Sequence, residues 1–168
     1  MSTQPEMNNA TPASEMTPRE QQDNTEWLLR QFASDTPGVT HAVLLSRDGL
    51  RLLDSEVDRD WADELSAGLS GVASLAAKIT GPSNRRSPAK QVVIERGDCL
   101  IFVQSAGRSA AFDNRPSDAR GQVETILAVI AGTDADAGLV GFEMGRLVGK
   151  FAESMLVPVR VGTGPEVR

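Results

Sequence analysis

The most informative hydrophobic pattern in the chain lies between Trp61 and Ile79. Apolar side chains recur there at intervals of three and four residues, which is typical of an amphipathic helix. The pattern therefore predicts a helix, capped by Asp58 or Asp60, with one inward-facing stripe. The stripe consists of Trp61, Leu65, Leu69, Val72, Ala76 and Ile79.

The opposite side of this predicted helix carries small residues where charged ones are usual. No charged residue occurs from Leu65 to Ala77, and Gly68 and Gly71 lie away from the stripe. Each glycine costs a helix about 1 kcal/mol relative to alanine, so a compensating contact is expected. We predict that a second helix, most simply its twin in a homodimer, packs here; burial in one large monomeric core is the alternative. The expected interface consists of Leu65, Gly68, Leu69, Gly71, Val72, Ala73, Leu75 and Ala76.

The N-terminal part of the chain divides into a tail and a helix. Residues 1–16 are polar and lack apolar periodicity, which is typical of a disordered tail. Residues 17–20 (TPRE) form a capping-box pattern with proline at the first helical position. A helix is predicted from there to residues 35–38 (DTPG), which end it. Its apolar side is expected to carry Trp27, Leu28, Gln31 and Phe32, widened by Leu29.

Five short apolar runs predict five strands. Four of them form two hairpins: residues 40–46 with 50–55, around an Asp-Gly turn, and residues 90–95 with 98–104, around an Arg-Gly turn. Residues 123–131 give the fifth. Because several runs do not alternate between apolar and polar residues, we expect strands that are buried on both faces.

The C-terminal third is expected to hold a loop and a last helix. Residues 105–122 are small, charged and turn-forming, so we expect an inserted loop that is disordered or loosely packed; a functional loop is the alternative. A helix is predicted after Asp134 or Asp136, ending near Pro158, with residues 159–168 as a tail. Its inward stripe is expected to be Val140, Met144, Leu147, Val148, Phe151 and Met155.

These elements predict an α/β (α+β) fold in the order α-β-β-α-β-β-β-α. Tight turns make the paired strands antiparallel. A sheet with both faces covered needs helices on each side, so we expect a three-layer α/β/α sandwich around a five-stranded antiparallel sheet. The central helix is expected on one face, and the first and last helices on the other. The length fits a single domain, which we place at residues 17–158.

Composition excludes several classes of protein. The net charge of −6 argues against a partner that is a nucleic acid or an anionic membrane. No apolar run is long enough for a membrane span and no signal-peptide pattern is present, so we expect a cytoplasmic protein without membrane insertion. The single Cys99 lies among apolar residues and is expected to be a buried, reduced thiol.

The sequence offers no convincing catalytic set. His41 is the only histidine, and one histidine with one cysteine cannot close a zinc site unless carboxylates supply the remaining ligands. Residues 145–151 (GRLVGKF) have the wrong spacing for a phosphate loop and lie within a predicted helix, where the backbone N–H groups are already bonded. We therefore expect a binding module that is not an enzyme, with no catalytic residues, no cofactor and no metal.

Three motifs resemble the roadblock/dynein light-chain domain family, especially its actinobacterial branch. These motifs are Pro37-Gly38-Val39 leading into HAVLLSRDGL, the Trp27–Phe32 pattern, and residues 138–144 (GLVGFEM), with Phe142 at a position where the branch has Tyr. The resemblance spans about residues 24–156. Residues 105–122 depart from it, because the family usually joins the fourth and fifth strands by only a few residues.

The resemblance implies a roadblock/profilin-like fold and a dimer, whose sheets pair edge to edge and whose middle helices lie side by side. It further implies a non-enzymatic regulator or scaffold in bacterial signalling that binds a Ras-like small GTPase and biases its nucleotide cycle. A sensor-kinase-like protein is a further implied partner. The alternative is a small-molecule-sensing α/β/α domain, with Gly68, Gly71 and Ala73 lining a cavity between helix and sheet.

Overall fold

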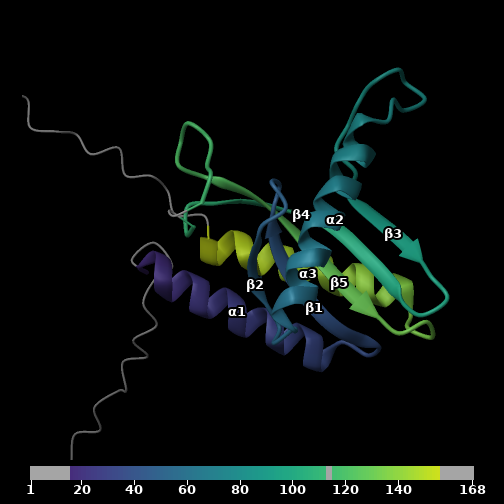
Figure 1. Ribbon diagram of the computed structural model, residues 1–168, viewed down its shortest axis with the longest axis horizontal. Coiled ribbons are helices and arrows are strands. Elements are labelled where there is room, and N and C mark those ends of the chain that lie inside the picture. The colour runs from purple at the N-terminus through teal and green to yellow at the C-terminus, as the bar shows by residue number, and fades with distance from the viewer. Residues whose placement is uncertain (1–15, 113–114, 156–168) are drawn as a thin grey trace, which may run out of the picture.

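A computed structural model describes residues 16–112 and 115–155 of the chain. The expected tails therefore fall, except for Met16, outside the described residues, as does the helix end near Pro158. The order of elements is the predicted one (Figure 1). The helices are α1 (Pro18–Asp35), α2 (Arg59–Lys78) and α3 (Ala137–Met155), and the strands are β1 (Val39–Ser46), β2 (Arg51–Asp54), β3 (Gln91–Glu95), β4 (Leu100–Ser109) and β5 (Val123–Ala131).

The strands form one antiparallel sheet in the order β2-β1-β5-β4-β3. The last strand of the chain, β5, therefore lies in the centre, where it pairs with β1 on one side and β4 on the other. Strands β2 and β3 are the two edges. Each edge strand is joined to its neighbour by one of the two predicted tight turns.

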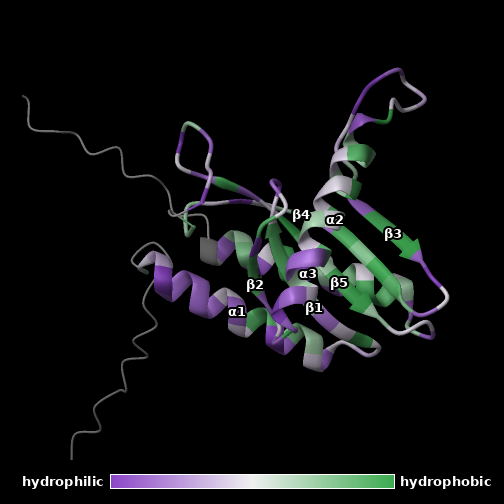
Figure 2. Cartoon of the chain, viewed as in Figure 1, coloured by the Kyte–Doolittle hydropathy of each residue, from purple (hydrophilic) through white to green (hydrophobic). Residues whose placement is uncertain are grey.

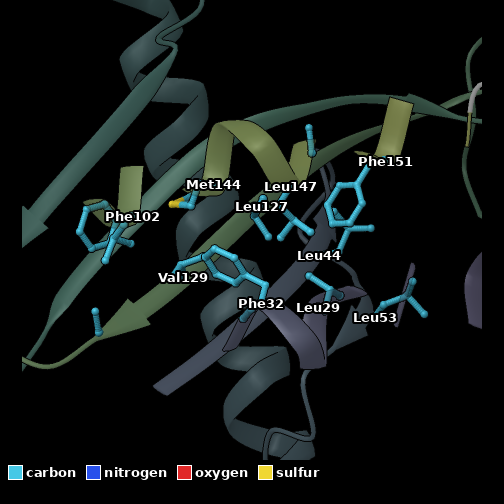
Figure 3. Packing of buried hydrophobic residues seen from close by; sticks show 14 of the residues in the cluster. Leu29, Phe32, Leu44, Leu53, Phe102, Leu127, Val129, Met144, Leu147 and Phe151 are labelled. Atoms are coloured by element: carbon cyan, nitrogen blue, oxygen red, sulfur yellow. The ribbon is translucent and has the colours of Figure 1, made fainter. Parts of the chain in front are cut away.

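The sheet is covered on both faces, which confirms the three-layer prediction. Helices α1 and α3 lie on one face and α2 lies on the other (Figure 1). Leu44 faces α1 and α3, whereas its neighbour Leu45 faces α2. Likewise, Val129 faces α1 and α3, and its neighbour Ile130 faces α2. This is why the central strands contain unbroken apolar runs, residues 100–103 in β4 and 126–131 in β5. Figure 2 shows green along much of these strands. Figure 3 shows the larger cluster: Leu29, Phe32, Leu44, Leu53, Phe102, Leu127, Val129, Met144, Leu147 and Phe151.

Helix α1 begins as predicted, but its buried side differs from the predicted one. Thr17 Oγ1 accepts the Glu20 N–H at 3.3 Å, and the Glu20 carboxylate accepts the Thr17 N–H at 2.7 Å, which completes the capping box. The buried positions include Thr25 and Leu29 as well as Phe32, whereas Trp27 is exposed. The prediction was wrong for Trp27 and for Gln31, which is also exposed, because Leu29 and Thr25 occupy the side of the helix that faces the sheet.

Two structural features require glycine in the Asp-Gly turn between β1 and β2. Gly49 adopts φ +86°, a conformation that side chains disfavour. A Cβ atom at this position would also lie 2.9 Å from Ser70 Oγ and 3.3 Å from the Ala67 Cα. The hairpin therefore approaches α2 closely, and only glycine leaves room for that approach.

The segment between β4 and β5 is packed more firmly than predicted. Strand β4 continues to Ser109, past an irregularity at Gly107 where φ is +84°. Ala111 and Phe112 are buried in the cluster beneath α1 and α3, and the Gln22 side-chain amide donates to the Ala111 carbonyl. The expectation of a loose loop is thus wrong for residues 105–112, because the strand register carries Phe112 into the core.

Helix α3 follows the predicted pattern. Asp136 caps it by accepting the Leu139 N–H at 3.0 Å. Val140, Met144 and Phe151 are buried, together with Leu147, and Val148 packs beside them; the Met155 side chain lies outside the described residues. None of the helices in the part of the chain that the structure describes is long and apolar enough to cross a membrane.

Candidate partner-binding surface

The inward side of α2 is anchored on the sheet by its N-terminal half. Asp58 caps the helix by accepting the Trp61 N–H at 3.0 Å. Trp61, Leu65 and Val72 pack against the apolar face of the sheet, and Leu69 is buried there. The predicted inward stripe is confirmed for these four residues. It is wrong for Ile79, which is 68% exposed, because α2 ends at Lys78 and leads into a loop that projects from the domain (Figure 1).

The outward side of α2 is open and free of charge over three turns. Gly68 and Gly71 are exposed, and a Cβ atom added at either would meet no atom within 4 Å. Leu75 on the same helix is 66% exposed. Nothing within the described chain therefore requires glycine at these two positions, and their cost to the helix is not offset by an internal contact.

The structure separates the residues that were predicted to form the interface. Gly68, Gly71 and Leu75 are exposed, whereas Leu69 is only 6% exposed and faces the sheet. Leu69 can therefore offer almost no surface to a partner, and its inclusion was wrong. Four further predicted residues are partly buried: Leu65, Val72, Ala73 and Ala76.

A second open surface lies at the β3 edge of the sheet; the resemblance implied pairing between sheet edges, but the residues alone did not predict which strand is the edge. Strand β3 pairs only with β4 in the described chain, so its outer backbone groups face away from the sheet. Val93 on this strand is 48% exposed, contrary to the prediction of a strand buried on both faces. Helix α3 reaches the same strand, because a Cβ atom at Gly141 would lie 2.9 Å from the Gln91 side chain. Phe142, the next residue, is 64% exposed.

The titratable residues of the described chain form no catalytic arrangement. His41 Nδ1 lies 2.9 Å from Thr40 Oγ1, and the ring contacts Trp61. Cys99 is a free thiol, but it is only partly buried, so the prediction of a buried thiol was wrong. Its partial burial and the neighbouring Asp98 raise the pKa of the thiol, which makes it a weaker nucleophile at neutral pH. Within residues 16–112 and 115–155, no group of three or more His, Cys, Asp or Glu side chains could hold a metal ion.

A cavity of about 170 Å³ lies between the C-terminal half of α2 and the sheet. Ala73 lines it, as the small-molecule alternative predicted, but Gly68 and Gly71 do not. Those two glycines face outward, so the uncharged side of α2 and the cavity are separate features. The other lining residues are Arg47, Ser74, Ala77, Arg86, Ser87, Pro88, Ala89, Val92, Val103, Ser105, Glu124 and Ile126.

Comparisons with known proteins give a consistent result. Residues 25–112 match a family model described as the Roadblock/LC7 domain. The crystal structure of a Roadblock/LC7 domain from Streptomyces avermitilis is similar, with 35% identity and a TM-score of 0.61 over 74% of this chain and 92% of that one. A second structure of such a domain from the same organism has 30% identity and a TM-score of 0.54, over 74% and 95% of the two chains.

The gliding protein MglB from Thermus thermophilus shares the fold at 16% identity, with a TM-score of 0.62 over 80% of this chain and 90% of that one. A comparison with curated proteins finds no match.

Proposed function

Since the chain belongs to the Roadblock/LC7 domain family, we propose that it is a homodimeric, non-enzymatic regulator or scaffold for a Ras-like small GTPase in bacterial signalling. The main support is the open, uncharged side of α2 around Gly68, Gly71 and Leu75. The family resemblance supplies the arrangement, in which the middle helices of two subunits lie side by side.

The proposed dimer gives the two glycines of α2 a role. Helices pack with their axes about 8–10 Å apart, and small side chains allow the closer distances. With two copies related by a twofold axis, Gly68 and Gly71 of each α2 would face the same surface of the other. Burial of Leu75 in that contact would also remove a large exposed apolar side chain from water.

The β3 edge supports the same dimer. An unpaired strand edge is a template for another strand, and Val93 is exposed on it. Pairing of β3 with its copy would join two five-stranded sheets while the α2 helices meet on one face.

As a regulator, the dimer would act by binding one nucleotide state of the GTPase better than the other. A ligand shifts an equilibrium only by its difference in affinity for the two states, so nucleotide preference is the property to measure. The paired α2 helices are the proposed contact surface. We place the protein in the cytoplasm, with a sensor-kinase-like protein as a further partner.

The experiment has two stages on the full chain. Light scattering coupled to size exclusion should give twice the mass of one chain. Binding to the Ras-like GTPase encoded nearest to the gene is then measured with that GTPase loaded with GDP or with a GTP analogue. Leu75→Glu should weaken binding, whereas Leu139→Glu, an exposed leucine on α3, should not. A monomer would refute the dimer, and equal affinity for both nucleotide states would refute the regulatory role.

A further inference from the structure

The cavity beneath α2 arises from the size of the helix residues along its length. In the N-terminal half, Trp61, Leu65 and Leu69 fill the space between helix and sheet. In the C-terminal half, Ala73, Ser74 and Ala77 face the same layer and are too short to fill it. The space of about 170 Å³ that remains has an apolar floor formed by Val92, Val103 and Ile126.

The wall of the cavity carries one cation that no carboxylate neutralises. Arg47 is engaged by Glu124, with its Nη1 at 3.0 and 3.1 Å from the two carboxylate oxygens. Arg86 also lines the cavity, and it forms no ion pair with any residue in the described part of the chain. The wall therefore has a net positive charge at Arg86.

The loop that carries Arg86 is held by its backbone. Thr80 and Arg86 form an antiparallel bridge, and the Gly81 N–H donates to the Arg85 carbonyl at 2.8 Å. Asn84 adopts φ +59°, which closes the turn. Arg86 is therefore placed at the cavity by a folded turn, whereas the adjacent Arg85 is not among the lining residues.

We propose that this cavity binds a small monocarboxylate with an apolar body about the size of a benzene ring. A cavity of about 150 Å³ holds one benzene molecule, so the volume fits such a body. The apolar part would lie on Val92, Val103 and Ile126, and the carboxylate would pair with Arg86. An anion is favoured over a cation because Glu124 is already neutralised by Arg47.

The test uses the full chain, labelled with ¹⁵N, and sodium benzoate as the probe, with hexanoate as a second carboxylate. Saturable shifts of backbone amides around Ala73, Ala77 and Val92 are expected, with millimolar affinity. Benzamide, which has the same shape without the charge, should bind about fivefold to tenfold more weakly. Absence of saturable shifts with both carboxylates, or equal affinity for benzamide and benzoate, would overturn the proposal.

Two pairs of variants locate the site. Arg86→Gln should lose about fivefold to tenfold in benzoate affinity, whereas Arg85→Gln should keep it. Ala77→Leu should fill the cavity and abolish binding, whereas Ala152→Leu, at an exposed position on α3, should not. Equal effects of the two arginine substitutions on benzoate affinity would refute the role of Arg86. This comparison does not depend on whether Ala77→Leu folds.

Discussion

The rings of His41 and Trp61 meet edge to face, with their centroids 4.8 Å apart and their planes at 85°. His41 belongs to β1 and Trp61 to the first turn of α2, so this contact joins the start of the helix to the sheet. The same turn is capped by Asp58. The N-terminal half of α2 is thereby held in place, while its outer side remains open to a partner.

Trp61→Ala should lower the free energy of unfolding by about 2 kcal/mol, because the partly buried indole leaves the apolar face of the sheet. Urea unfolding followed by far-UV circular dichroism measures this change. The matched control is Trp27→Ala. Because the Trp27 indole is 53% exposed, its removal should change the free energy of unfolding by less than about 0.5 kcal/mol. A double-mutant cycle with His41→Ala should give a coupling of about 0.5–1 kcal/mol. Equal losses for the two tryptophans would contradict the assigned packing.

Gly71→Leu should weaken dimerisation without destabilising the fold of the subunit. The new side chain meets open space within the chain, so the subunit should fold and gain up to about 1 kcal/mol of helix stability. In a dimer joined through α2, the same side chain would push the helices apart, and we expect at least about a tenfold rise in the dimer dissociation constant.

Light scattering over a concentration series measures that dissociation constant. Gly145→Leu on α3, where the added side chain also meets open space, is the matched control and should leave the constant unchanged. If Gly71→Leu dimerised as tightly as the natural sequence, the two helices would not meet through this side.

Phe112→Ala tests the segment between β4 and β5. Its ring is buried with Ala111 beneath α1 and α3, so its removal should cost about 3 kcal/mol of unfolding free energy. Denaturant unfolding measures the loss. Arg120→Ala, an exposed position in the same segment, should change the value by less than about 0.5 kcal/mol. A loose segment would give the same small change at both positions.

Cys99 should react slowly with iodoacetamide. Burial first, and Asp98 second, raise the pKa of its thiol, so at any pH below that pKa less of the reactive thiolate is present than in free cysteine. The pH–rate curve should therefore be displaced to higher pH. Asp98→Asn should move it back and raise the rate at pH 8 by about twofold. Asp48→Asn, in the turn between β1 and β2, is the control, and an equal response of both variants would rule out the local effect of Asp98.

Local chemistry was enough to predict the elements and their layers. The Thr17–Glu20 capping box, the Asp-Gly turn at Gly49 and the cap at Asp136 depend on backbone groups within a few residues, and all three are present. The unbroken apolar runs of the central strands required a sheet covered on both faces. The three-layer arrangement follows from that requirement and from the number of helices.

The surface and the cavity depended on which distant residues meet. Trp27 and Phe112 are both large and aromatic, yet one is exposed and the other buried, because the rotation of α1 and the register of β4 with β5 decide their positions. Val93 is exposed because β3 falls at the sheet edge. The cavity exists because alanines of α2 face valines and an isoleucine from separate strands. The spacing of residues along one segment shows whether that segment forms a helix or a strand. It does not show how large the residues are that pack against it from other segments.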